Sequence, residues 1–243
     1  MIEEKLRIPD PAAEALFIRP DGIAEFPGVL FLTDIWGPRP GNIGMANRLA
    51  EKGFAVLVPN VMHRYGPIQP DGLETDDAQE NSKRLGQLFQ MLKPDQMVSD
   101  GKAYVDFLLA QKGVKQQKIG VVGYCFTGQM AVRIAAAVPD KVAAAASFHG
   151  GFLVTDKPDS PHRILPPITA RLYFGHAVED STATPEQVAT LEQSLRDWHG
   201  AFQSEVYEGA RHGWTTPGRA VYNELQAERA FEKLVELFDA TLK

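Results

Sequence analysis

Strand-length apolar runs alternate with longer amphipathic segments along almost the whole chain, and this alternation is what most constrains the fold. Strands are predicted over residues 15–19, 29–33, 54–59, 118–122, 143–148, 170–175 and 202–207. Helices are predicted over residues 43–52, 97–111, 129–138, 185–199 and 220–242. Such alternation is typical of βαβ units. We therefore expect an α/β fold, with a mostly parallel sheet and helices on both of its faces.

Two segments depart from this regular alternation. The first predicted strand, 15–19, is expected in an antiparallel pair at the edge of the sheet. Residues 73–92 begin with crowded acidic side chains, and Gly86 interrupts their helical pattern. We expect this second segment to be an excursion that lies over the sheet.

The chain is expected to form a single domain over residues 1–243. It has no internal repeat, no low-complexity tract and no linker rich in Gly, Pro or Ser. A chain of 243 residues buries enough surface to be stable without disulfides or structural metals. Its 44% hydrophobic and 23% charged residues are those of an ordinary globular protein.

Charge and cysteine content exclude several classes of protein. The chain has 25 Lys and Arg against 31 Asp and Glu, a net charge of −6, which argues against a nucleic-acid-binding surface. Residues 1–10 contain no apolar signal region, and no run of 18 apolar residues occurs. We therefore expect a cytoplasmic protein without membrane attachment. Its single cysteine excludes an intrachain disulfide or a cysteine-based zinc cluster.

That cysteine lies where a buried strand turns sharply into a helix. Residues 120–131 read GVVGYCFTGQMA, with glycines on both sides of the turn. This is the context of a nucleophile elbow, in which the turn lifts Cys125 above the sheet and Gly123 leaves room for the helix. The positive end of that helix favours a negatively charged sulfur. Cys125 is therefore predicted to be a nucleophile rather than a small buried core residue.

A base and an acid are expected on loops that follow later strands. In this fold the chain order is nucleophile, acid, histidine. His212 comes just after the strand predicted at 202–207, so it reaches the same sheet edge as Cys125, and His149 is its main alternative. Asp180 is the predicted acid, which would orient the imidazole and stabilise its charged form, with Glu179 as the alternative. The same fold predicts oxyanion donors at the backbone N–H groups of Phe126 and Ile35.

These motifs resemble the dienelactone hydrolase family of α/β-hydrolase fold. The matching segments read Gly-Tyr-Cys at 123–125, Asp-Ile-Trp-Gly at 34–37, Val-Pro-Asn at 58–60 and Ala-Arg-His-Gly at 210–213, together with Asp180. The resemblance runs from about residue 29 to the last helix. It implies a Cys125, Asp180 and His212 triad that cleaves small lactones or esters through a thioester, with no metal or organic cofactor.

Three positions depart from the family's pattern. Thr127 stands where the family has glycine, and its bulk would change the geometry of the turn. Asp34 stands where the family has a glutamate that bonds the thiol, and it is one methylene shorter. Thr216 replaces an arginine that helps to hold the substrate carboxylate.

Other residues are candidates for contacts with substrate. Arg219 lies near Thr216 in the sequence, while Arg84 or Lys83 could supply the family's second arginine. The loss of one arginine from a carboxylate clamp can change the choice of substrate. Aromatic side chains that could line an apolar pocket instead are Trp36, Tyr65, Tyr124 and Trp214.

Two other functions share parts of this pattern. Glutamine amidotransferases also place a cysteine at an elbow, but they usually carry a glutamate two residues after the histidine, where this chain has Trp214. The second alternative is a non-catalytic ligand-binding module whose elbow has drifted, as Thr127 suggests. Dinucleotide binding is disfavoured because residues 120–123 lack the G-x-G-x-x-G spacing.

Overall fold

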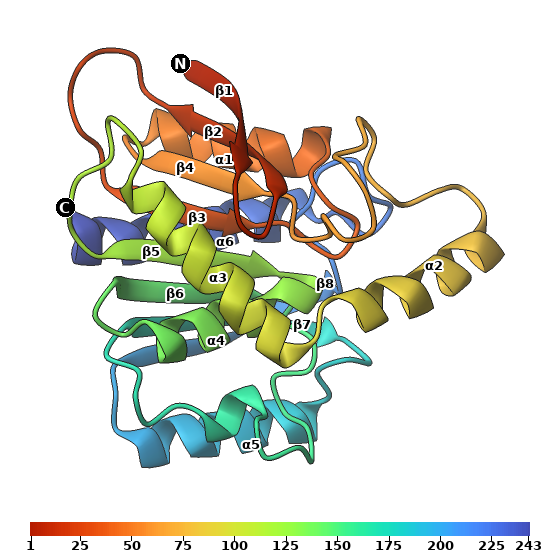
Figure 1. Cartoon of the computed structure of the whole chain (residues 1–243). Helices are drawn as coiled ribbons and strands as arrows, with labels where there is room; N and C mark the ends of the chain where they lie inside the picture. The colour runs from red at the N-terminus through yellow and green to blue at the C-terminus, as the bar shows by residue number, and fades with distance from the viewer.

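One eight-stranded sheet runs through the molecule in this computed structural model, which describes residues 1–243 throughout (Figure 1). The strands are β1 (Ile2–Ile8), β2 (Ala13–Arg19), β3 (Gly28–Leu32), β4 (Ala55–Pro59), β5 (Ile119–Tyr124), β6 (Val142–Phe148), β7 (Arg171–Glu179) and β8 (Phe202–Arg211). Their order across the sheet is β1-β2-β4-β3-β5-β6-β7-β8. The strands from β3 to β8 pair in parallel, whereas β1 and β2 run antiparallel at one edge. The expected mostly parallel sheet is confirmed.

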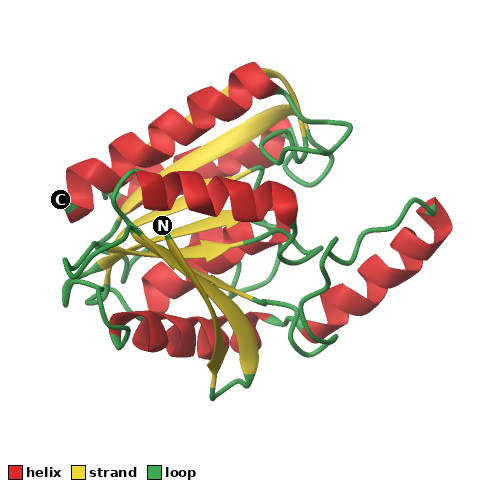
Figure 2. Cartoon of the chain, turned by 90° about the horizontal axis from the view of Figure 1, so that it is seen from above, coloured by secondary structure: helices red, strands yellow, loops and turns green.

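Helices cover both faces of this sheet, as the sequence predicts (Figure 2). They are α1 (Pro40–Glu51), α2 (Ala78–Met91), α3 (Pro94–Leu109), α4 (Gly128–Ala137), α5 (Pro185–Trp198) and α6 (Glu224–Leu242). Buried side chains of α1 and α6 form one apolar layer with the sheet, and those of α3, α4 and α5 form the other. Burial of apolar side chains on both faces is the main force that holds the layers together.

Close helix packing depends on a glycine in α3. A Cβ built on Gly101 would lie 2.3 Å from Cγ1 of Ile134 in α4, well inside contact distance. The absence of a side chain at Gly101 therefore allows α3 to press against α4. This contact fixes α3 against α4, the helix that follows the turn of the candidate nucleophile.

The structure confirms one prediction about the chain path and corrects another. The antiparallel edge pair expected for residues 15–19 is present: β2 pairs along its whole length with β1, residues 2–8, a strand that the sequence pattern did not indicate. The segment 73–92 does not lie over the sheet: its helix, α2, extends to one side of the molecule (Figures 1 and 2). Only Leu88 of α2 is fully buried, which is why the hydrophobic pattern of this segment was ambiguous.

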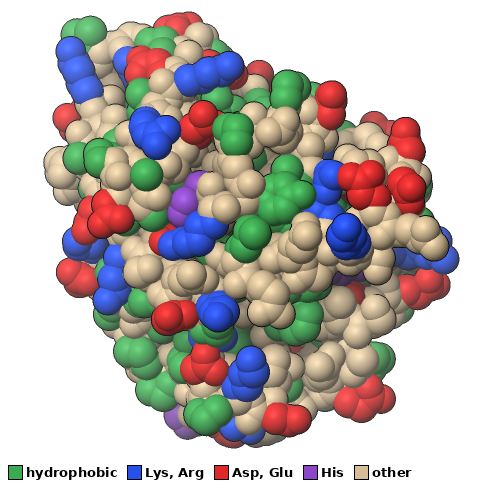
Figure 3. Space-filling model, turned by 45° about the vertical axis from the view of Figure 1, so that its right-hand side comes forward, with side chains coloured by type: hydrophobic (Ala, Val, Ile, Leu, Met, Phe, Trp, Pro, Cys, Tyr) green, Lys and Arg blue, Asp and Glu red, His purple; other side chains and the backbone are tan.

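The surface is chemically mixed. On the face shown in Figure 3, acidic and basic side chains are interspersed, with hydrophobic side chains between them. None of the helices has both the length and the apolar composition required to cross a membrane.

Candidate active site

The candidate nucleophile lies at the sharp turn between β5 and α4. Cys125 has φ of 57°, in the left-handed region that non-glycine residues seldom occupy. A Cβ at Gly123 would lie 2.2 Å from the carbonyl oxygen of Thr127, so only glycine fits there. Such strained conformations persist only where the surrounding structure holds them. The strand–turn–helix geometry that the sequence predicts for Cys125 is present.

The side chain of Thr127 fills the inside of this turn. Its hydroxyl accepts a hydrogen bond from the N–H of Tyr124 at 3.0 Å. The same oxygen lies 3.0 Å or less from the carbonyl oxygens of Leu32, Thr33 and Tyr124, and it can donate its proton to one of them at a time. The bulk of Thr127 therefore does not disrupt the turn, contrary to the expectation from the sequence. The threonine ties the turn to the end of β3, the neighbouring strand.

Removing this hydroxyl should destabilise the protein. In Thr127→Val the N–H of Tyr124 loses its acceptor and one of the three nearby carbonyl groups loses its donor, and an unsatisfied buried group costs about 1–3 kcal/mol. We expect the free energy of unfolding to fall by that amount in urea denaturation, while Thr127→Ser retains most of it. Equal stability of Thr127→Val and the parent protein would contradict this role.

The candidate base and acid meet at the carboxyl end of the sheet. Nδ1 of His212 lies 2.7 Å from Oδ2 of Asp180, whose side chain is completely buried. The hydroxyl and the N–H of Thr182 both donate to Oδ1 of Asp180, at 2.7 and 2.8 Å, which fixes the carboxylate. Glu179, the alternative acid, is exposed and pairs with Arg211 at 3.0 Å. Asp180 and not Glu179 therefore orients His212.

The electrostatics of His212 reflect both of its neighbours. Burial lowers its pKa, but the hydrogen bond to Asp180 and the interactions with Cys125 and the Asp180 carboxylate raise the pKa to about 10. Burial would raise the pKa of Asp180, yet the hydrogen bond and charge of His212 and the two bonds from Thr182 lower it. The imidazole is thus bonded to the carboxylate through Nδ1, and Cys125 contributes to its raised pKa.

These shifts predict how stability depends on pH. Because the pKa of His212 is raised from 6.5 to about 10, its stabilising contribution is complete below pH 6.5 and is lost as the pH rises toward 10. Asp180 has a lowered pKa, so its contribution is complete above its usual value of 3.8 and is lost as the pH falls through the lowered pKa.

In urea denaturation, the free energy of unfolding should therefore fall as the pH rises from 6.5 toward 10, and this fall should be absent from His212→Gln. Proton NMR of the His212 ring should give a pKa well above the usual 6.5. A measured value near 6.5 for His212 would contradict the paired arrangement.

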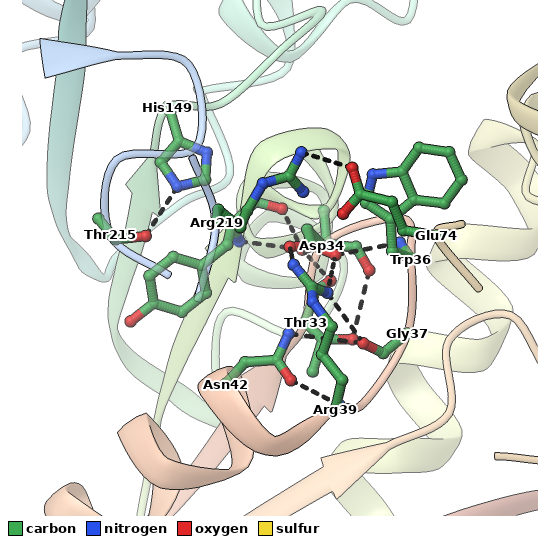
Figure 4. Close-up of polar contacts among 12 residues, drawn as sticks. Thr33, Asp34, Trp36, Gly37, Arg39, Asn42, Glu74, His149, Thr215 and Arg219 are labelled. Carbon is green, nitrogen blue, oxygen red and sulfur yellow. Dashed lines mark hydrogen bonds and ion pairs between the residues drawn. The ribbon is translucent and has the colours of Figure 1, made fainter. Parts of the chain in front are cut away.

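His149, the alternative base, lies beside His212 but has different partners. The two ring centroids are 5.1 Å apart, and Nε2 of His149 bonds the hydroxyl of Thr215 at 2.8 Å (Figure 4). His149 is fully buried, and burial holds its pKa well below the usual value. It has no carboxylate partner, so the structure favours His212 over His149 as the base.

Two backbone amides are placed to serve the oxyanion role predicted for them. Ile35 lies in the buried loop after β3, and its N–H makes no hydrogen bond within the chain. Phe126 follows Cys125 at the start of a short 3₁₀ turn, Cys125–Thr127, and the first N–H groups of a helix have no partner within it. Both residues lie at the sheet edge that carries Cys125, since β3 and β5 are neighbouring parallel strands.

Asp34 has a partner that the sequence analysis did not identify. Both of its carboxylate oxygens accept hydrogen bonds from Arg39, at 2.7 and 2.6 Å, and one also accepts from the N–H of Trp36 at 3.0 Å (Figure 4). Asp34 and Arg39 are both buried. The carboxylate is thus held by the guanidinium rather than by the thiol. No sequence motif links these two residues across the intervening turn.

Two of the three cationic candidates for substrate binding, Arg219 and Arg84, are paired with acidic side chains. Arg219 pairs with Glu74 at 2.8 Å on the same side of the site as Arg39 (Figure 4). Arg84 donates to the carbonyl oxygen of Leu73 and pairs with Glu80 of its own helix. Lys83 is exposed on α2. Figure 4 shows Arg219 close to the Asp34 and Arg39 pair.

The aromatic candidates are largely core residues. Trp214 is fully buried against Tyr207 and His149, so it is not a wall of an open pocket. Tyr124 stacks on Phe148 with ring centroids 5.6 Å apart, in the layer that contains α1 and α6. Contact of these two side chains with substrate stays a prediction.

Trp36 and Tyr65 belong to the opposite layer, the one that also contacts Cys125. Trp36 is almost completely buried there, whereas Tyr65 is partly exposed. No group of three or more His, Cys, Asp or Glu side chains is arranged to hold a metal ion.

Comparison with known proteins places this arrangement among hydrolases. A protein-family model for the dienelactone hydrolase family matches residues 13–242. The chain is 29% identical over 224 residues to a carboxymethylenebutenolidase of Rhodococcus opacus, covering 88% of this chain and 81% of that protein. It is 28% identical over 229 residues to the hydrolase tropI of Talaromyces stipitatus, covering 92% and 85%.

Solved structures share the fold. The crystal structure of P91, a dienelactone hydrolase-like promiscuous phosphotriesterase from metagenomic libraries, superposes with a TM-score of 0.82 at 22% identity. The match covers 100% of this chain and 99% of P91. The sheet and helices described above therefore recur in an enzyme of similar length.

Proposed function

This chain is a member of the dienelactone hydrolase family, and we propose that it hydrolyses small lactones or esters with Cys125 as the nucleophile. One observation carries the proposal: Nδ1 of His212 is bonded to the buried Asp180 at 2.7 Å, at the edge of the sheet where Cys125 occupies its strained turn. A nucleophile, a base and an orienting acid in this order are the components that covalent acyl transfer requires.

In the first half of the reaction His212 takes the proton of the Cys125 thiol, and the sulfur attacks the acyl carbon of the substrate. The carbonyl π electrons move onto oxygen, where the N–H groups of Phe126 and Ile35 stabilise the negative charge. When the tetrahedral species collapses, the bond to the alcohol oxygen breaks and His212 donates a proton to that oxygen. The product of this step is a thioester on Cys125; from a lactone, the freed hydroxyl stays on the acyl chain.

In the second half water replaces the alcohol. His212 removes a proton from water as it attacks the thioester carbon, and the same two amides stabilise the new oxyanion. Collapse releases the carboxylic acid and returns the sulfur to its original state. Asp180 keeps Nδ1 of His212 protonated and stabilises the charged imidazole, but it does not itself take up the proton.

A panel of lactones, aryl esters and thioesters tests this proposal. We expect turnover of at least one class, and mass spectrometry of the protein quenched during turnover should show an acyl adduct on the peptide that contains Cys125. Substrate binding without turnover would instead support the non-catalytic ligand-binding module.

A further inference from the structure

A recess in the surface begins at Phe126, the residue after the candidate nucleophile. This recess, which we call the phenylalanine cleft, has a volume of about 750 Å³ and lies where the junction of α2 and α3 faces α4 (Figure 1). Three phenylalanines line it, Phe89, Phe126 and Phe152, and each pair meets edge to face with ring centroids 5.0–5.8 Å apart. Phe89 and Phe152 are more than a third exposed, an unusual position for rings that pack on one another.

The phenylalanine cleft adjoins the candidate active site at Phe126. Phe126 contributes its ring to the cleft, and its N–H is a proposed oxyanion donor. The loop that carries Phe152 is anchored to the nucleophile, because the N–H of Gly151 donates to the carbonyl oxygen of Cys125 at 3.2 Å. An acyl group held on Cys125 therefore has the cleft beside it.

A buried guanidinium lies further along the same wall. Phe126 lies in the 3₁₀ turn before α4, and Gln129 and Arg133 lie in α4; all three side chains line the cleft. Arg133 follows Phe126 by about two helical turns. The wall thus presents an apolar ring at one end and a positive charge at the other.

The hydrogen bonds of Arg133 within the protein are incomplete, although its side chain is only 6% exposed. Nη1 donates to the carbonyl oxygen of Asp159 at 2.8 Å and lies 3.5 Å from that residue's carboxylate. Nε reaches Gln129 only at 3.5 Å, and Nη2 donates no hydrogen bond. Nη2 is not fully enclosed by protein, so a ligand in the cleft can reach this donor.

The balance of charge in the cleft also favours an anion. Three cationic side chains line it, Lys93, Arg133 and Lys157, against two carboxylates, Asp95 and Asp159. Asp159 is half exposed, so it only partly neutralises Arg133. A planar guanidinium with a free donor is suited to bind a carboxylate.

We propose that Arg133 binds a terminal carboxylate of the substrate, at the far end of an apolar chain that packs on Phe89, Phe126 and Phe152. This inference rests on the proposed hydrolase function and names its substrate class: esters whose acyl or alcohol part is long, apolar and carboxylated at its end. Because Arg133 follows Phe126 by about two helical turns, we expect long chains and not short diacids to reach it.

Matched esters test the proposal. Mono-p-nitrophenyl esters of succinic, suberic and sebacic acids are compared with p-nitrophenyl butyrate, octanoate and decanoate, and acetate esters of long ω-hydroxy acids are compared with acetates of neutral alcohols. We expect the carboxylate to raise kcat/KM for long chains only, mainly through KM. The series that shows this effect identifies whether the acyl or the alcohol part occupies the cleft.

Variants of Arg133 provide the second arm. In Arg133→Gln the ratio of kcat/KM for the suberate half-ester to that for the octanoate should fall about tenfold to a hundredfold, as expected for loss of a charged hydrogen bond. Arg133→Lys should recover part of this ratio. The charge-matched control Lys118→Gln, an exposed site at the start of β5 and remote from the cleft, should not change it.

The outcomes separate the two proposals. Suppose that kcat/KM depends on chain length in the same way for neutral and carboxylated esters, and that the suberate-to-octanoate ratio is unchanged in Arg133→Gln. This result would overturn the role of Arg133 and leave the hydrolase function intact. Absence of turnover with every ester and lactone would overturn both. Unfolding midpoints of each variant establish that a change in the ratio is not a change in the folded fraction.

Discussion

Cys125→Ala should lose hydrolytic activity by at least about a thousandfold, because no other thiol in the chain can form the acyl intermediate. The residual activity would come from the oxyanion amides and from substrate binding alone. Alanine tolerates the left-handed backbone of this turn about as poorly as cysteine does, so the variant adds little new strain. Rates on the best ester or lactone substrate provide the measurement.

Two further observations make that experiment decisive. Far-UV circular dichroism and the urea midpoint should match those of the parent protein, which separates loss of chemistry from loss of structure. Cys125→Ser provides a comparison in which an oxygen nucleophile occupies the same turn. If Cys125→Ala retained the parent rate, the sulfur would not be the nucleophile and the thioester route would be excluded.

Asp180→Asn should lower kcat by about 10³ to 10⁴-fold with little change in fold. The asparagine can still accept from Thr182 with its amide oxygen, but its NH₂ group then faces Nδ1 of His212, where a hydrogen-bond acceptor is needed. The imidazole would adopt the other tautomer, with its proton on the nitrogen that should face the sulfur. The lost carboxylate would also lower the pKa of His212.

The neighbouring Glu179→Gln is the matched control, because Glu179 is exposed and pairs with Arg211 rather than with His212. Its kcat should stay within about threefold of the parent value, since an exposed ion pair contributes little. NMR titration of His212 in both variants completes the test. Equal losses in Asp180→Asn and Glu179→Gln would show that the acid had been assigned wrongly.

The order of the chain predicted which acid and histidine meet, and the structure brings Asp180 and His212 together. Parallel strands end at a common edge, so loops that follow β7 and β8 converge whatever their own sequences. The exact strand ends were less predictable. β7 and β8 extend several residues past the predicted runs, because Glu179 pairs with Arg211 across the two strands and local hydropathy does not report such pairing.

Contacts made by long charged side chains were the least predictable feature of the site. Arg39 reaches back to Asp34 around a turn, and Arg133 lies in a helix whose other residues indicate only an amphipathic pattern. Burial of an arginine depends on how neighbouring layers pack, which no spacing rule encodes. The same limit explains why Trp214 and Tyr124 were predicted as pocket residues, although tertiary packing buries them in the core.

The chain has one cysteine, and it lies partly exposed at the turn after β5. If peroxide converts its sulfur to a sulfenic acid, no second cysteine of the chain can form a disulfide with it. Recovery then depends on small thiols from the surroundings, and further oxidation to the sulfinic acid would be irreversible. The working lifetime of this protein is therefore coupled to the redox state of its surroundings through a single atom.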